Sequence, residues 1–373
     1  MASMERSLQA AAVVGNVTHF SVSEAEIQIK DSILAIDQQA WNHLCRPQQF
    51  MRHEYLRALE ASDLDCQYAY ALAFVGGELV GIALATTWRI AVTRKLSFRV
   101  TTMGTPVNTG LPLAVLVRSD LVDLPFLLVT ALQKFSASQG IRLFIGRDFP
   151  EPDYVQRLVL EKLYNCAYLD LCWDTFEQYL SQHPKRKGIR RDLRSLEKAG
   201  YQLEIRKGVP LSSVEAHRIH ELWLQLYSKH QSPDQIKVSQ DFFMQLSLLP
   251  HSVYLLLKKE DRIDAFDLCF VLGDQLESTY CGVDLTVTKR LSVHRAMGYH
   301  IVRYALEEKL RCINFGISNE QGKVEMGCRL NVRYAWLVAS PAWLGLMLRP
   351  LLRRFVLEQG GSRGQGAAKG ASA

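Results

Sequence analysis

The chain repeats one order of predicted elements, and this repeat constrains its fold more than any other feature. Each half begins with helices, which are followed by two strands joined by a tight turn. A third strand, a long helix and a buried strand then complete the order. The corresponding segments are Gly76-Gly77 and Glu260-Asp261 for the turns, 120–140 and 294–310 for the long helices, and 141–145 and 312–315 for the buried strands. A repeat about 170 residues apart is too long for a solenoid. It predicts two copies of one α+β domain.

Further helices complete the two copies and set the domain boundaries. We expect helical regions over 38–62 and 153–163 in the first half and over 214–230 and 241–249 in the second half. The last residues are rich in Gly, Ala, Ser and Lys, a composition typical of a disordered tail. The predicted units are an N-terminal domain over 1–180, a C-terminal domain over 181–358 that includes the joining helix, and a disordered tail over 359–373.

The composition is that of a globular protein, with 48% hydrophobic and 22% charged residues among 373. Its eight cysteines are scattered without a Cys-x-x-Cys pair, which favours reduced thiols in the cytoplasm and gives no zinc-ligand spacing. The first 20 residues lack the sustained apolar run of a signal peptide, and we find no clean apolar stretch of about 18 residues. We therefore expect a cytoplasmic protein without a metal site.

A basic segment near the middle of the chain predicts contact with an anion. It contains six cationic side chains: Lys185, Arg186, Lys187, Arg190, Arg191 and Arg194. As a helix it places Ile189, Leu193 and Leu196 on one apolar side and the cations elsewhere. A solvated helix face is the alternative reading. We expect Lys185, Arg186, Arg190 and Arg191 to contact an anionic substrate, and the pattern leaves the identity of that ligand open.

Four segments, in this order, resemble the tandem-GNAT, FemAB-like acyltransferase superfamily, particularly its branch associated with peptidoglycan biosynthesis or recognition. They are Phe50–Ser62, Phe74–Gly81, Tyr168–Arg191 and Asn314–Gly327. The third is the most specific, because it runs from Phe176 and Tyr179-Leu180 into Lys185-Arg-Lys-Gly-Ile-Arg-Arg191. The chain departs from the family pattern at Asn314, where an acidic residue is frequent. It also departs at 289–298, where a glycine-rich loop is replaced by Arg295-Ala-Met-Gly298.

The resemblance implies two tandem GNAT-like domains, each a mixed sheet flanked by helices. It also implies that a helix N-terminus beside splayed central strands holds the pyrophosphate of acyl-CoA, which would be a co-substrate and not a tightly bound cofactor. Unpaired amide groups and the helix dipole favour anions at such a terminus. We therefore expect His294, Arg295 and Gly298 to contact the donor.

Acyl transfer to an amine needs a base and donors for the developing oxyanion. Asp267 interrupts an apolar strand, so its carboxyl group lies either at an open slot or beside a partner. Asp284 lies just beyond a strand end, where site residues are common. Lys323 matches the family's terminal lysine, which the resemblance places near the substrate. We predict catalytic roles for these three residues, with ordinary structural roles as the alternative for each.

These features predict an N-acyltransferase that moves an acyl or aminoacyl group from a thioester or a tRNA ester to an amine. Acyl-CoA fits the predicted helix start, whereas aminoacyl-tRNA or an acyl carrier protein fits the basic segment. A non-enzymatic alternative is binding to an anionic membrane surface through Trp336 and the basic, apolar segment 343–354. The chain contains no Gly-x-Ser-x-Gly, Walker A or His-Glu-x-x-His motif, so those hydrolase, NTPase and metalloprotease classes lose their usual support.

Overall fold

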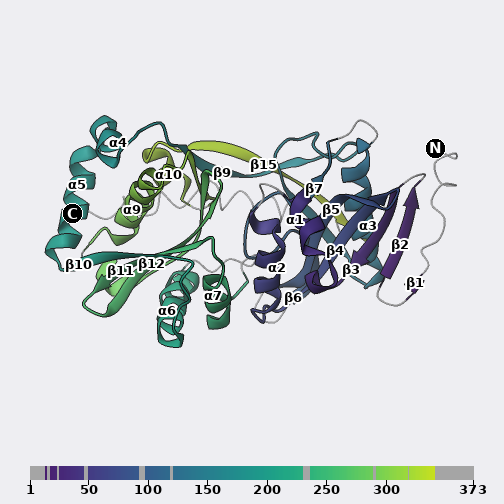
Figure 1. The fold of residues 1–373 in the computed structure, drawn as a ribbon, viewed down its shortest axis with the longest axis horizontal. Coiled ribbons are helices and arrows are strands. Elements are labelled where there is room, and N and C mark those ends of the chain that lie inside the picture. Colours follow the sequence, from purple (N-terminus) through teal and green to yellow (C-terminus); the bar gives the residue numbers. More distant parts are fainter. Residues whose placement is uncertain are drawn as a thin grey trace, which may run out of the picture.

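A mixed β-sheet runs through the whole molecule and carries helices on both faces (Figure 1). The computed structural model describes residues 13–14, 17–22, 25–45, 49–91, 97–117, 121–229, 236–288, 291–317 and 319–340. Over these residues the sheet has 15 strands in the order β1-β2-β3-β4-β5-β6-β8-β15-β9-β14-β13-β12-β11-β10, with β7 paired to β5.

The first half of the chain supplies strands β1 to β9 and helices up to α4. Its strands are β1 (Val13–Val14), β2 (Val17–Val22), β3 (Ala25–Lys30), β4 (Cys66–Val75), β5 (Glu78–Ala91), β6 (Ser97–Met103), β7 (Leu113–Val115), β8 (Leu143–Phe149) and β9 (Glu161–Asp170). Its helices are η2 (Ile33–Ala35), α1 (Gln38–Leu44), η3 (Gln49–Met51), α2 (His53–Glu60), α3 (Leu124–Ser138) and α4 (Phe176–Gln182).

The second half repeats this plan after the basic helix. Its helices are α5 (Arg186–Lys198), α6 (Ser213–Lys229), α7 (Gln240–Ser247), α8 (Leu285–Thr288), α9 (Val293–Glu307) and α10 (Glu320–Glu325). Its strands are β10 (Tyr201–Lys207), β11 (Ser252–Lys259), β12 (Arg262–Leu272), β13 (Gln275–Val283), β14 (Cys312–Gly316) and β15 (Arg329–Ala339).

Local chemistry explains where several of these elements begin and turn. Gly76 and Gly77 join β4 to β5 with φ angles of 59° and 85°, which glycine adopts without a Cβ clash. Asp37 caps α1 by accepting a hydrogen bond from the Ala40 amide, and Ser239 caps α7 through the Phe242 amide. These signals are local, so the hairpin and the helix starts follow from the sequence.

The two halves exchange their last strands at the centre of the sheet. In each half a parallel pair forms the middle, β6 with β8 and β13 with β14. Strand β9 then pairs with β14 of the second half, and β15 lies between β8 and β9. The sheet is therefore continuous across the predicted boundary at residue 180, and that boundary stays a prediction.

Apolar side chains from the helices cover both faces of the sheet. Helix α3 packs on one face of the first half, whereas α1 and α2 pack on the other. In the second half, α5 and α9 share one buried cluster with β11 to β14, and α4 from the first half packs into the same cluster. Helices α6 and α7 cover the opposite face, and their cluster is continuous with that of α1 and α2. In the figure, α5 and α9 lie across the sheet from α6 and α7 (Figure 1).

The predicted helix over 153–163 is wrong. Residues 153–160 form turns and irregular backbone, and residues 161–163 already belong to β9. Arg157 has a φ of 70°, a left-handed conformation that ends any right-handed helix, and its guanidinium pairs with Asp123 at 2.7 Å. Val155 and Leu160 are nevertheless buried in this irregular segment.

Other predicted helices and strands are present with shifted ends, and β10 was not predicted. The tail over 359–373, the segment 343–354 and the pair Lys289 and Arg290 lie outside the described residues. Of the helices that the structure describes, none combines the length and apolarity needed to span a bilayer.

Candidate functional site

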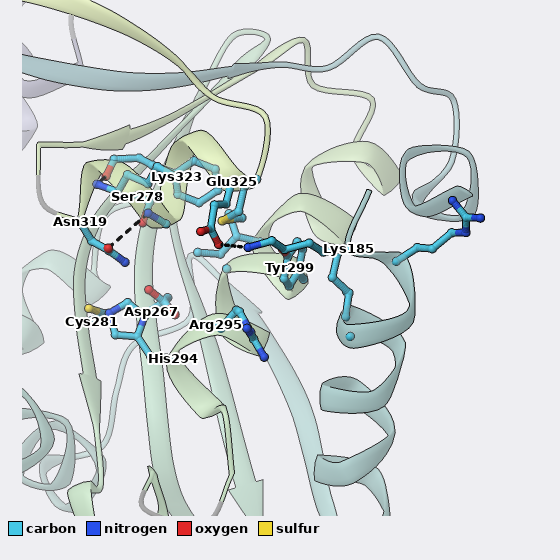
Figure 2. A pocket seen from close by; sticks show the side chains of 18 of the residues that line it. Lys185, Asp267, Ser278, Cys281, His294, Arg295, Tyr299, Asn319, Lys323 and Glu325 are labelled. Atoms are coloured by element: carbon cyan, nitrogen blue, oxygen red, sulfur yellow. Dashed lines mark hydrogen bonds and ion pairs between the residues drawn. The ribbon is translucent and has the colours of Figure 1, made fainter. Parts of the chain in front are cut away.

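A cavity of about 810 Å³ opens in the second half where the parallel strands β13 and β14 part (Figure 2). The two strands pair at Gln275–Glu277 and Cys312–Asn314, after which β14 ends at Gly316 with a φ of 70°. Strand β13 continues to Val283 and exposes its edge to the gap. The lining comes from β12, β13, the end of β14, α9, α10 and the start of α5.

Two helix N-termini meet at this cavity. Helix α5 begins after Lys185 and α9 begins after Ser292, and neither residue caps its helix through a side chain. The first amide groups of a helix carry partial positive charge and attract anions. Lys185, Arg186, Lys187 and Arg191 also line the cavity. The mouth of the cavity is therefore positively charged.

The three residues predicted to contact the donor all line the cavity. Arg295 forms an ion pair with the buried Asp192 of α5, so its guanidinium joins α9 to α5. A Cβ atom added to Gly298 would lie 3.2 Å from Cε of Met326, so a larger side chain would enter the cavity. His294, in the first turn of α9, lies beside Asp267 (Figure 2).

The predicted anion-binding residues divide into two groups. Lys185 pairs with Glu325 of α10 at 2.6 Å across the cavity wall, and Arg186 and Arg191 line the mouth. Arg190 is not among the lining residues, because it pairs with Glu177 of α4 at 2.9 Å on the surface. The structure therefore brings three of the four residues to the cavity.

Asp267 supplies a buried carboxyl group at the inner end of the cavity. It lies on β12 opposite Cys281 of β13, and only 7% of its surface is exposed. Among the residues that the structure describes, none donates a hydrogen bond to this carboxyl group. Burial raises the pKa of Asp267, whereas the nearby His294 lowers it. The sequence predicted either an open slot or a partner, and the structure has the open slot.

Lys323 is also buried beside the cavity, with 9% of its surface exposed. Helix α10 positions it after Asn319, which has a φ of 54° and caps the helix through the Gly322 amide. The Lys323 ammonium donates a hydrogen bond to the Phe315 carbonyl oxygen at the end of β14. Burial lowers its pKa to about 8, although the nearby Cys281 and Cys328 thiols act in the opposite direction.

Asp284 is held away from the cavity. Its Oδ2 atom accepts a hydrogen bond from Arg218 of α6 at 2.9 Å, and its Oδ1 atom accepts from Thr286 at the start of α8. Arg218 also contacts the buried Asp264. Asp284 therefore organises the end of β13 and does not line the cavity.

Sequence reasoning missed Glu277, which lies at the last paired position before β13 and β14 part. Its Oε2 atom accepts a hydrogen bond from Asn314 at 2.7 Å, and burial raises its pKa to about 7. An acidic residue at 314 would place a second carboxyl group against Glu277, whereas the Asn314 amide donates a hydrogen bond to it. The alternation Gln275-Leu276-Glu277 looks like an ordinary exposed strand face, so the pattern gave no signal.

Cys281 lies near the end of β13 and lines the cavity together with Asp267 and Lys323. Its place in the cavity could have been predicted from strand pairing, because the residue opposite Asp267 in an antiparallel pair lies on the same face of the sheet. Within the described part of the chain, no group of three His, Cys, Asp or Glu side chains is arranged to hold a metal ion.

Comparisons with known proteins agree with this architecture. Residues 184–324 match the acetyltransferase (GNAT) domain family. The matched segment begins at the basic helix and ends just after Lys323, so it contains most of the cavity lining. No match to the chain is found among curated proteins.

Three solved structures share the fold across most of their length. The structure of L-PGS from Bacillus licheniformis is 13% identical and has a TM-score of 0.55, covering 86% of this chain and 96% of that chain. The structure of FemX is 10% identical with a TM-score of 0.51, covering 83% and 98%. A tandem GNAT protein from the clavulanic acid biosynthesis pathway is 10% identical with a TM-score of 0.50, covering 85% and 98%.

These likenesses confirm the fold that the sequence motifs predicted. Residues 184–324 therefore form a GNAT acetyltransferase-type domain, and the whole chain shares its fold with FemX, with L-PGS and with a tandem GNAT protein.

Proposed function

We propose that this protein is an N-acyltransferase that takes an acyl group from an acyl-CoA thioester and transfers it to a primary amine in the cavity of the second half. The observation that carries this proposal is the polarity of the cavity. Its mouth combines two helix N-termini with Arg186, Lys187 and Arg191, whereas its inner end holds the buried Asp267.

This polarity suits a donor with phosphates at one end and a reactive carbonyl group at the other. Phosphates at the mouth would be held by helix amide groups and guanidinium groups. The acyl group would then extend between β13 and β14 toward Asp267 and Lys323. A donor held in this way has its carbonyl carbon fixed near both groups, which supplies the orientation that acyl transfer needs.

The inner residues have the properties that the chemistry requires. Asp267 accepts the proton of the attacking group, because its pKa is raised toward neutral pH by burial. The Lys323 ammonium stabilises negative charge on the carbonyl oxygen as the tetrahedral intermediate forms. Both groups are held on regular elements, β12 and α10, so little reorganisation is needed.

A second candidate donor is aminoacyl-tRNA, favoured by the cations that continue along α5 beyond the cavity. Arg190 and Arg194 lie on the exposed side of this helix, where a polynucleotide backbone would meet them. Such binding is strongly dependent on salt concentration, because phosphate contacts release counterions. The two donors therefore differ in how steeply their affinity falls with salt.

A thermal-shift titration with acetyl-CoA and a long-chain acyl-CoA tests the proposal. A ligand that binds only the folded protein at 100 times its dissociation constant adds about 2.7 kcal/mol to the free energy of unfolding. We expect a saturable rise in the melting temperature that is lost when Arg295→Ala is combined with Gly298→Trp. No shift with either thioester, together with salt-sensitive binding of aminoacyl-tRNA, would favour the second donor.

A further inference from the structure

Cys281 faces the inner end of the cavity beside the groups that would perform acyl transfer. It lies directly opposite Asp267 in the antiparallel ladder of β12 and β13, and both residues line the cavity. Directly opposed residues share one face of a sheet, with Cβ atoms about 4.5–5.5 Å apart. Figure 2 shows the Cys281 and Asp267 side chains next to each other above His294.

Lys323 lies close enough to Cys281 for its positive charge to act on the thiol. An ammonium group has three N–H donors, and Lys323 uses one of them on the Phe315 carbonyl oxygen. The remaining N–H donors of Lys323 can bond to the oxygen of a carbonyl group whose carbon is attacked by the Cys281 thiol. The cavity thus contains a nucleophile, a base and an electrophilic group within one polar cluster.

The buried Asp267 is the observation that makes this cluster a site for chemistry. Its carboxyl group is more than nine-tenths buried, lines the cavity and accepts no hydrogen bond from any residue that the structure describes. A buried carboxyl group without a donor is costly unless a ligand or a reacting proton meets it. The Cys281 thiol is the side chain directly opposite this carboxyl group in the ladder.

We propose that the acyl group is first transferred from the thioester donor to Cys281, so that the reaction passes through a covalent acyl-Cys281 intermediate. This inference rests on the proposed function, because it takes the donor to be an acyl thioester. In the first step, Sγ attacks the thioester carbonyl carbon and the thiol proton passes to Asp267. The bond from that carbon to the carrier sulfur breaks, and the carrier thiolate takes the proton.

In the second step, the acceptor amine attacks the acyl-Cys281 carbonyl carbon and the bond to Sγ breaks. The amine proton passes through Asp267 to the Cys281 thiolate, which restores the enzyme. Burial raises the pKa of the Cys281 thiol to about 12, so the resting thiol is protonated and depends on this base. Lys323 holds the carbonyl oxygen in both steps.

Isotope exchange tests the intermediate without knowledge of the acceptor. The full chain is incubated with acetyl-CoA and isotope-labelled free CoA, with no amine added. A covalent intermediate regenerates acetyl-CoA from labelled CoA, so label enters the thioester, and denatured protein carries one acetyl group on the peptide with Cys281. We expect exchange and acetylation to be lost in Cys281→Ala and retained in Cys172→Ala, which alters an exposed cysteine outside the cavity.

The thermal shift with acetyl-CoA, measured on the same samples, separates the possible failures. If wild type and Cys281→Ala both bind acetyl-CoA but wild type shows no exchange and no acetyl-cysteine, the covalent step is wrong and the proposed function survives. If wild type binds no acyl-CoA, both proposals fail. Cys281→Ser serves as a second variant, so a melting temperature lowered by Cys281→Ala alone does not decide the outcome.

Discussion

The two halves of the molecule share one plan, yet one has an open slot between its central strands and the other is closed there. The equivalent parallel strands are β8 and β14, which pair with β6 and β13 through Ile145 and Ile313, respectively. Three positions after each isoleucine comes a residue with left-handed backbone, Asp148 in β8 and Gly316 in β14. This match places Arg147 of the first half where Phe315 stands in the second. Arg147 donates hydrogen bonds to the carbonyl oxygens of Thr105 and Asn108.

These hydrogen bonds hold the loop that follows β6 over the place that corresponds to the open slot of the second half. In the first half, β6 ends at Met103 and Gly104 turns the chain with a φ of 79°. In the second half, β13 continues for six residues beyond Glu277, and the gap remains as the cavity. The same fold is therefore closed by a loop in the first half and leaves a cavity in the second.

The two equivalent long helices, α3 and α9, also differ in the charged groups at their N-termini. Helix α3 begins after Asp123, whose carboxylate lies near the positive end of the helix but forms no capping hydrogen bond and pairs with Arg157. Pro125 in the first turn removes one amide donor from this end. Helix α9 begins after Ser292 and carries His294 and Arg295 in its first turn. An anionic donor is therefore favoured only at the second of these helix starts.

We expect the largest effect from Arg147→Ala, which removes the contacts that hold the loop over the slot position in the first half. This change removes two hydrogen bonds and leaves the buried Asp148 without its guanidinium neighbour. We expect the free energy of unfolding to fall by about 3 kcal/mol, measured by urea denaturation. Acyl-CoA affinity per folded molecule should not change. Arg157→Ala removes an exposed ion pair and should cost less than about 1 kcal/mol; equal losses would refute the closing role of Arg147.

Filling the slot of the second half should abolish donor binding. Gly298→Trp places a large side chain against Met326 and into the cavity. At a donor concentration 100 times the wild-type dissociation constant, we expect the stabilisation of about 2.7 kcal/mol to disappear. Lys134→Trp on the exposed side of α3 is the matched control in the first half, and it should keep the full shift. Loss of binding in the control would mean that both halves contact the donor.

The buried Lys323 should give the second half a pH dependence of stability. Burial lowers its folded pKa from 10.5 to about 8, so between these values the unfolded chain binds more protons than the folded chain. The contribution of Lys323 to the free energy of unfolding is therefore lowest below pH 8, and it rises as the pH increases from the folded pKa toward the unfolded pKa. We expect the free energy of unfolding of wild type relative to Lys323→Met to rise by about 1 kcal/mol between pH 8 and pH 9.

Neighbouring thiols titrate in the same range but are common to both proteins. Burial raises the pKa of Cys281 and of Cys328 to about 12, so unfolding releases their protons above pH 9 and lowers stability. Subtracting the two denaturation curves removes most of this contribution. A difference that stays constant from pH 7 to pH 9.5 would show that the folded environment does not depress the pKa of Lys323.

The smallest effect concerns the positive mouth of the cavity. Arg186→Gln removes one exposed charge at the start of α5, and we expect acyl-CoA affinity to fall about three-fold at low salt and hardly at all at high salt. Lys198→Gln removes one charge at the far end of the same helix and should leave the affinity unchanged. Isothermal titration at two salt concentrations measures both. An equal loss in both variants would indicate a long-range charge effect.

The sequence predicted the repeated plan because hairpin turns and helix periodicity are local signals, whereas the GNAT fold and the acyltransferase class were implied by the resemblance of four segments to a known family. It did not predict the exchange of β9 and β15, since strand pairing across the molecule depends on contacts between distant residues. The helix expected over 153–163 failed because Arg157 adopts a left-handed conformation fixed by its surroundings.

The candidate site was predictable where a residue broke a pattern. Asp267 stood out as a carboxyl group within an apolar strand, and it lies in the cavity. Asp284 occupied an equally suggestive place, but Arg218 from a distant helix holds it elsewhere. Glu277 escaped notice because its burial depends on Asn314 and the neighbouring strands, which only the folded sheet brings together.

Hydrogen–deuterium exchange with and without a long-chain acyl-CoA tests most directly whether the second half alone holds the donor. We expect slower exchange at the start of α5, in the first turn of α9 and in α10, with no change in 97–117 or in β8. Protection in the first half at 104–108 and β8, or equal protection in both halves, would contradict this expectation.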